Sequence, residues 1–247
     1  MSGHSKFANI KHRKGKSDEQ RGKLFTKLGR EIAVAVRSGG PDPANNSSLS
    51  DAVAKAKAAN MPNDSITRSI KKAHGGGEGE NYEEVVYEGY GPDGIAVYVV
   101  AMTDNRNRTA ADVRHHFDKF GGNLGTNGCV AYMFDKKGVI IIEKAKSVDE
   151  DTLTMDALEA GADDVMIEDE YYEILTKPED FSAARAALDK KGYEMIEADV
   201  QMVPSAYLKL DEKHIGTMIR LIENLEDLDD VQNVYHNWDR PEEEAAD

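Results

Sequence analysis

The chain has 247 residues, 40% hydrophobic and 31% charged, which is typical of a soluble globular protein with two or three small domains. Its longest apolar run, 95–102, is far too short to span a bilayer, and the basic start has no apolar segment behind it. Neither a membrane span nor a secretory signal is therefore expected. The single cysteine, Cys129, excludes an internal disulfide and a cysteine-based zinc site, and it favours a cytoplasmic location.

Charge is distributed unevenly along the sequence. Residues 1–75 contain 15 Lys and Arg against 6 Asp and Glu, a balance of +9, whereas residues 76–247 contain 16 against 40, a balance of −24. This asymmetry predicts a basic module that meets nucleic acid, attached to an acidic body that repels phosphates over most of its surface. Binding is then expected at the basic end and at local groups of arginines.

The first seventeen residues, MSGHSKFANIKHRKGKS, form a cationic arm with few apolar residues. Such a segment cannot bury enough surface to fold alone, and its scattered cations with one aromatic ring suit irregular RNA or a DNA backbone. The alternative is a solvated tail. The arm residues expected to contact nucleic acid are Lys6, Phe7, Lys11, His12, Arg13, Lys14 and Lys16.

Three helices are predicted after the arm, at 18–38, 49–60 and from 63 or 64 to 73. The first has apolar residues at helical spacing, and Gly39-Gly40 ends it. Its remaining faces carry cations, of which Arg21, Lys23 and Lys27 are further candidates for nucleic-acid binding. Residues 1–75 are therefore predicted to be a basic arm and a small helical domain.

The rest of the chain mixes strands and helices. Strands are expected at 85–90, 95–103, 129–134, 139–144, 164–168, 171–176, 194–202, 206–210 and 231–238, with a turn at 135–138, and helices at 109–120, 149–160, 178–191 and 212–225. From 139 the order is β-α-β-β-α-β, a ferredoxin-like unit. Because the final elements cannot extend that completed unit, they are expected to return to the strands at 85–103.

The predicted fold class is α+β, with an N-terminal three-helix domain followed by two interleaved α/β domains. The expected domains are 1–75, a discontinuous α/β domain of 81–134 plus 204–240, and an inserted ferredoxin-like domain at 137–203.

The segment 103–134, TDNRNRTAADVRHHFDKFGGNLGTNGCVAYMF, places cations beside a Gly- and Asn-rich loop. Two arginines, Arg106 and Arg108, are expected in a polar loop, and Thr109 is the predicted N-cap of a helix that carries Arg114. These three arginines on a rigid support form a surface suited to anionic backbones, and they complete the set of predicted nucleic-acid-binding residues.

No catalytic residue, metal ligand or cofactor site is predicted. Neighbouring helical residues point about 100° apart, so His115 and His116 cannot bind one metal from their helix alone. No HExxH or phosphate-loop motif occurs, Cys129 is expected to be a buried, inert thiol in a strand, and the acidic clusters, including Asp229-Asp230, are interpreted as solvated faces.

Two alternatives to nucleic-acid binding stay open. One is an enzyme that holds a phosphorylated substrate with Arg106, Arg108 and one of the two histidines, in a cleft between the α/β domains. The other is an acidic scaffold for protein partners with an incidental basic tail.

Several phrases of the sequence resemble the YebC/PmpR family: GHSKFANIKHRK, RGKLFTKLGREI, KAKAANMPND, YEGYGPDG and the whole of 103–134. The family includes a mitochondrial translational activator of cytochrome oxidase, and the likeness covers nearly the whole chain. It implies three domains, two of them interleaved, and a cytoplasmic, non-enzymatic regulator of gene expression. By position, the family's basic arm falls on residues 6–14 and its arginine-bearing segment on Arg106, Arg108 and Arg114; Phe7 stands where the family usually has Trp.

The resemblance implies either regulation of transcription or action at the ribosome on difficult stretches of translation. Ribosomal RNA or transfer RNA is the preferred partner, because the arm suits irregular RNA. Duplex DNA is the alternative partner. No membrane is expected to be involved, and no protein partner is predicted.

Overall fold

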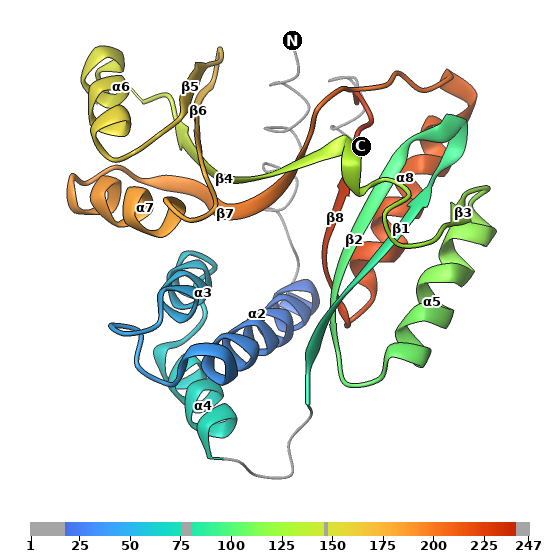
Figure 1. Ribbon diagram of the computed structural model, residues 1–247, viewed down its shortest axis with the longest axis horizontal. Helices are drawn as coiled ribbons and strands as arrows, with labels where there is room; N and C mark the ends of the chain where they lie inside the picture. The colour runs from blue at the N-terminus through green and yellow to red at the C-terminus, as the bar shows by residue number, and fades with distance from the viewer. Residues whose placement is uncertain (1–17, 76–80, 146–147, 241–247) are drawn as a thin grey trace. The chain divides into compact units, whose positions relative to one another are not determined.

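The structure, a computed structural model, describes residues 18–75, 81–145 and 148–240 (Figure 1). Over these residues the fold is α+β, as predicted, with helices α2–α8 and strands β1–β8. They form two compact units, one of residues 136–203 and one that combines 18–135 with 204–240. The predicted arm residues Lys6, Phe7, Lys11, His12, Arg13, Lys14 and Lys16 lie outside the described residues.

The helical domain consists of α2 (Asp18–Gly39), α3 (Ser47–Ala58) and α4 (Asn63–His74). Its core takes Leu28 and Ile32 from α2, Leu49 from α3 and Ile66 from α4, all nearly fully buried. Asn46 ties α2 to α3: its side-chain oxygen accepts from the Leu49 N–H at 3.0 Å, and its amide donates to the Ala35 carbonyl at 2.7 Å. The three predicted helices are therefore confirmed.

The first sheet has the strand order β3-β1-β2-β8 and is built from two distant parts of the chain. Strands β1 and β2 form an antiparallel hairpin around a 3₁₀ turn, and β8 pairs antiparallel with β2, with Val99 opposite Val234. The final strand thus returns to the first hairpin, as the element order predicted. The bounds of these elements are β1 Glu83–Tyr90, η1 Pro92–Gly94, β2 Ala96–Thr103, β3 Asn123–Leu124 and β8 Val231–His236.

Helices α5 (Arg106–Lys119) and α8 (Glu212–Asp227) share one core with this sheet. Phe117 of α5, Leu221 of α8 and Trp238 after β8 are buried together against β2. Because α5 follows β2 and α8 precedes β8, the packing holds the start of α5 close to the turn between α8 and β8.

The inserted unit has the strand order β5-β6-β4-β7, and the pairs β4–β6 and β5–β6 are antiparallel. This is the arrangement of a ferredoxin-like unit, as predicted. Helices α6 and α7 share a core with its sheet through Leu153, Phe181 and Ile174. The bounds are β4 Phe134–Glu143, α6 Glu150–Glu159, β5 Asp164–Ile167, β6 Tyr171–Thr176, α7 Phe181–Lys190 and β7 Met195–Pro204.

Three predicted local features are wrong. The turn at 135–138 does not exist, because β4 runs without interruption through Gly138. A Cβ atom at Gly138 would collide with the Thr176 hydroxyl and with Phe181, so this glycine serves a close approach and not a turn. The predicted strand 129–134 is instead a loop that ends in the 3₁₀ turn η2 (Ala131–Met133), followed by Phe134 at the start of β4. Within 206–210 only Leu208 makes a β-bridge, to Trp238.

None of the helices in the described ranges is both long enough and apolar enough to cross a membrane.

Candidate nucleic-acid interface

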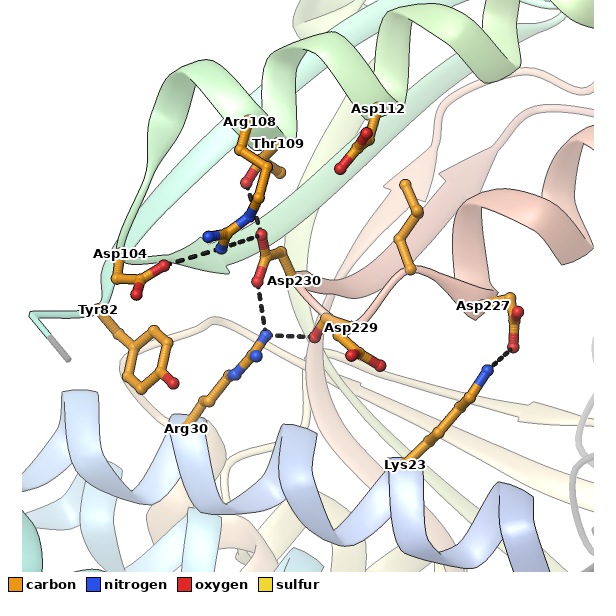
Figure 2. A pocket seen from close by; sticks show the side chains of 11 residues that line it. Lys23, Arg30, Tyr82, Asp104, Arg108, Thr109, Asp112, Asp227, Asp229 and Asp230 are labelled. Atoms are coloured by element: carbon orange, nitrogen blue, oxygen red, sulfur yellow. Dashed lines mark hydrogen bonds and ion pairs between the residues drawn. The ribbon is translucent and has the colours of Figure 1, made fainter.

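A row of cations on α2 faces the acidic segment 226–230, which includes the last turn of α8 and the link to β8 (Figure 2). Lys23, Lys27 and Arg30, here called the cationic stripe, are four and three residues apart and so lie on one side of the helix. Lys23 Nζ is 2.6 Å from Asp227 Oδ1, and Lys27 Nζ donates to the Glu226 carbonyl at 2.6 Å. Each residue of the stripe therefore contacts the acidic segment.

Arg30 makes the innermost contacts of the stripe. Its Nη1 donates to the Asp229 carbonyl at 2.5 Å and to Asp230 Oδ1 at 2.8 Å, and its guanidinium lies 4.9 Å from the ring centre of Tyr82. The side chains of Arg30 and Asp230 are only 13% and 9% exposed. This pair is therefore shielded from water, unlike Lys23 and Asp227, which are 37% and 68% exposed.

Asp230 is the centre of the site. Its Oδ2 accepts from Arg108 Nη2 at 2.9 Å, from the Thr109 hydroxyl at 2.7 Å and from the Thr103 hydroxyl at 3.2 Å. Together with Arg30, these donors satisfy a carboxylate that would otherwise be buried at high free-energy cost. Asp230 thus links α2, the end of β2 and the start of α5. The interpretation of Asp230 as part of a solvated acidic face is wrong, whereas Asp229 is exposed.

Burial and hydrogen bonding act in opposite directions on the pKa of Asp230. Burial is the largest influence and raises it, but the hydrogen bonds from Arg108 and Thr109 and the charges of Arg108 and Arg30 outweigh burial, so the pKa is lowered. The pKa of Arg108 is raised by its hydrogen bonds to Asp230 and Asp104. The pair is therefore ionised at neutral pH.

The start of α5 differs from its predicted form. The helix begins at Arg106, and Asn105 is its N-cap, with its side-chain oxygen accepting from the Arg108 N–H at 3.1 Å. Thr109 is not the cap; it lies in the first turn, buried against Asp230. Arg106 and Arg108 are consequently held on a helix and not in a loop.

Both of these arginines are paired with carboxylates of the same chain. Arg106 forms a two-pronged ion pair with Glu83, with Nε–Oε1 at 2.5 Å and Nη2–Oε2 at 2.7 Å, and its side chain remains 61% exposed. Arg108 Nη2 lies 2.8 Å from Asp104 as well as 2.9 Å from Asp230. A nucleic acid would therefore meet partly neutralised arginines here.

These groups surround a polar pocket of about 550 Å³. Its lining contributes three cations against five carboxylates, so the pocket is acidic and unsuited to a free phosphate. Of the predicted binding residues, it gathers Lys23 and Arg108. The full lining is Lys23, Arg30, Tyr82, Asp104, Arg108, Thr109, Asp112, Asp227, Leu228, Asp229 and Asp230.

The other predicted residues lie around this pocket. Lys27 is on the cationic stripe, and Arg21 is exposed on α2. Arg114 is exposed on α5, and no carboxylate of the described ranges pairs with it. Arg30 and Asp230 are not among the predicted site residues. Arg30 occurs at the right helical spacing after Lys23 and Lys27, so the spacing could have identified it, but no sequence signal separates Asp230 from the acidic residues around it.

The Gly- and Asn-rich loop after α5 is held by a second buried carboxylate. Glu88 of β1, 4% exposed, accepts from the backbone N–H groups of Gly128, Val130 and Ala131 at 2.6, 2.9 and 2.7 Å. Cys129 lies in this loop and not in a strand; burial raises the pKa of its thiol, so it is a poor nucleophile. Three hydrogen bonds to Glu88 therefore anchor the end of this loop to β1.

The two adjacent histidines point to different surroundings, as the helical geometry predicts. His115 is exposed, whereas His116 is half-buried and stacks on Phe120 with ring centres 6.4 Å apart. Within the described ranges, no group of three His, Cys, Asp or Glu side chains could hold a metal ion. The pocket at Asp230 includes neither histidine nor Arg106, so it does not assemble the residues of the proposed phosphate-substrate enzyme.

Comparison with known families gives two matches that together span most of the chain. Residues 5–76 match the model described as the TACO1/YebC protein N-terminal domain. Residues 82–238 match the model described as the TACO1/YebC second and third domain.

Individual proteins match over nearly their full length. A protein of Acetivibrio thermocellus named "Probable transcriptional regulatory protein" is 67% identical over 96% of this chain and 99% of its own. One of the same name from Ruminiclostridium cellulolyticum is 63% identical over 98% of each chain. The crystal structure of a conserved hypothetical protein from Aquifex aeolicus, 49% identical, covers 92% of this chain and 93% of its own with a TM-score of 0.82.

Proposed function

Because this chain belongs to the TACO1/YebC family, we propose that it is a nucleic-acid-binding regulator of gene expression and that it acts on RNA at the ribosome. The names of its relatives support a regulatory role of the family and suggest nucleic acid as the partner. The ribosomal site of action and the choice of RNA are the finer parts of the proposal.

The observation that carries the proposal is the concentration of cations in the helical domain. On residues 18–75, ten Lys and Arg stand against six Asp and Glu, whereas the chain as a whole is at −15. Phosphate contacts by Lys and Arg supply most of the sequence-independent affinity for nucleic acids. A polyanion should therefore approach the molecule at this domain.

RNA is favoured over duplex DNA by the kinds of side chain available. The arm supplies cations and one aromatic ring, Phe7, which suits unpaired bases and irregular backbones. Helix α4 follows α3 across the short link at Met61-Pro62, an arrangement that could imitate a helix-turn-helix. However, its cations Lys71 and Lys72 are in its last turn, whereas a recognition helix reads bases with its N-terminal residues.

Duplex DNA remains the second candidate because the relatives carry the name of transcriptional regulators and because α4 also exposes Arg68. On DNA, the same cations would contact phosphates and give affinity with little sequence information.

The proposal is tested by ultraviolet cross-linking of the full-length protein in growing cells, followed by sequencing of the attached nucleic acid and mapping of the cross-linked peptides. Cross-links to ribosomal and transfer RNA through residues 1–40 are the expected result. Cross-links to a few duplex DNA regions, with ribosomal RNA at the background level, would establish the second candidate. Absence of both would contradict the nucleic-acid role itself.

A further inference from the structure

The acidic segment 226–230, Glu-Asp-Leu-Asp-Asp, contacts all three cations of the stripe on α2. Lys23 contacts Asp227, Lys27 contacts the Glu226 carbonyl, and Arg30 contacts Asp229 and Asp230. Figure 2 shows the Lys23 and Arg30 side chains reaching from α2 toward this segment. The stripe is thus matched along its length by anionic or carbonyl oxygens.

We infer that the acidic segment 226–230 is an internal competitor of nucleic acid: its oxygens at Asp227 and Glu226 occupy Lys23 and Lys27 of the stripe until a phosphate backbone displaces them. The inference rests on the proposed function, because it identifies the surface that binds the nucleic acid and the acidic groups that compete for that surface. The partner is defined by its chemistry, a polyanion with regularly spaced phosphate oxygens.

The chemistry of the covering groups resembles that of a phosphate backbone. Asp227 offers Lys23 a carboxylate oxygen, and the Glu226 carbonyl belongs to the C-terminal end of α8, where the helix dipole adds partial negative charge. Lysine binds phosphate and carboxylate oxygens as a point charge, so it exchanges one for the other without a change of geometry. The lysines of the stripe can therefore change partner.

The contacts differ in strength along the stripe, and this sets the order in which they would be exchanged. Lys23 and Asp227 are both well exposed, and such pairs contribute little net stability. Arg30 and Asp230 are shielded from water, and Asp230 is held by three further donors from β2 and α5. A polyanion would thus displace Asp227 first and leave the Arg30–Asp230 pair in place.

The test measures binding of a short fluorescein-labelled oligouridine, and of a fluorescein-labelled duplex DNA, to the full-length protein by fluorescence anisotropy. Asp227→Asn keeps the size of an exposed side chain and removes its charge, so folding should be retained. We expect it to tighten binding about two- to fivefold, the effect of removing one exposed competing ion pair.

Asp112→Asn is the matched control, because Asp112 lines the same pocket and is exposed, but no contact joins it to α2 in the described parts of the chain. It should tighten binding less than Asp227→Asn. In a Lys23→Gln background, the gain from Asp227→Asn should disappear, because the cation that it releases is then absent.

Three results would overturn the inference. Equal gains from the two Asn variants, or a gain from Asp227→Asn that persists in the Lys23→Gln background, would mean that only the net charge matters. If the wild type binds the probe and neither Lys23→Gln nor Asp227→Asn changes the affinity, the stripe on α2 is not part of the nucleic-acid-binding surface. The proposed function would still stand. Failure of every variant and of the wild type to bind either probe would contradict the proposed function, and the inference with it.

Discussion

Arg30 of α2 and Asp230, the residue just before β8, are 200 residues apart in sequence and form an ion pair of 2.8 Å that is largely shielded from water. The pair joins the helical domain to the discontinuous sheet, and the second oxygen of Asp230 carries the connection on to Arg108 and Thr109. One carboxylate therefore positions both Arg30 of α2 and Arg108 of α5.

Replacing Asp230 by Ala should lower the free energy of unfolding by about 3–5 kcal/mol, because it leaves the buried Arg30 charge without its partner. The free energy of unfolding is measured by urea titration, with circular dichroism as the signal. Asp229→Ala is the control: the Asp229 side chain is exposed and its contact to Arg30 is made by the backbone, so a change within about 0.5 kcal/mol is expected. Equal decreases in the two variants would show that the pair does not stabilise the fold.

The lowered pKa of Asp230 also makes a pH-dependent contribution to stability. Its folded pKa lies below the unfolded value of about 3.9, so the contribution is fully present above that value and disappears as the pH falls through the folded pKa. In Asp230→Asn, the fall in unfolding free energy below pH 4 should be smaller than in the wild type. An equal fall in unfolding free energy below pH 4 in the two proteins would contradict this assignment.

His116 should make the protein less stable as the pH falls from 7 to 5. Burial, together with the nearby His115 and Lys119, lowers its folded pKa below the ordinary value of about 6.5. The unfolded chain then takes up a proton at a higher pH than the folded chain, which favours unfolding in that interval. His116→Gln should reduce the difference in unfolding free energy between pH 7 and pH 5, whereas His115→Gln should reduce it less, because burial is the largest cause of the lowered His116 pKa.

The basic arm should contribute several phosphate contacts. Replacing Lys11, Arg13 and Lys14 by Ala should weaken binding of labelled RNA and reduce the slope of log K against log salt by about 0.7–0.9 for each phosphate that the arm no longer neutralises. Lys177→Ala, an exposed cation of the inserted unit, serves as the control and should leave the slope unchanged. An unaltered slope in the triple variant would exclude the arm from the interface.

Two glycine-to-alanine substitutions should have opposite effects on stability. A Cβ atom at Gly89 would lie 2.5 Å from the Asn123 carbonyl oxygen and 2.8 Å from the Phe117 ring, so Gly89→Ala should destabilise the protein by about 1–3 kcal/mol. Gly216 lies exposed inside α8 with open space around its Cα, so Gly216→Ala should stabilise by about 0.5–1 kcal/mol. Thermal and urea unfolding of the two variants would test both signs, and destabilisation by Gly216→Ala would contradict the reasoning from helix propensity.

The sequence predicted the order of the elements well, because hydrophobic periodicity and glycine positions are local signals. The strand 171–176 agrees with β6, and the start of α8 at Glu212 is correct. The return of the last strand to the first hairpin followed from element order alone, since a completed β-α-β-β-α-β unit leaves no place for further strands. The boundaries 1–75, 81–134 plus 204–240 and 137–203 stay predictions.

The errors arose where a local signal had a tertiary cause. Asp135-Lys136-Lys137-Gly138 has the composition of a turn, but its glycine is required by the approach of Thr176 and Phe181 from other elements. Thr109 could cap a helix, yet Asn105 lies four residues earlier and caps it instead, which leaves the Thr109 hydroxyl for Asp230. Asp230, which pairs with Arg108, and Asp227, which pairs with Lys23, lie more than 100 residues from these cations, so periodicity in a single sequence cannot pair them.

The late position of the acidic segment 226–230 has a consequence for the order of events during synthesis. The N-terminal part of a chain emerges first and domains fold as units, so α2 and its cationic stripe leave the ribosome long before residue 226 is made. Strand β8 and the segment that precedes it can join only after the whole inserted unit has been translated, which makes their pairing a contact of very high sequence separation. In a growing chain, α2 is therefore made well before its acidic partner, and the contacts between the stripe and segment 226–230 can form only after the inserted unit has been synthesised.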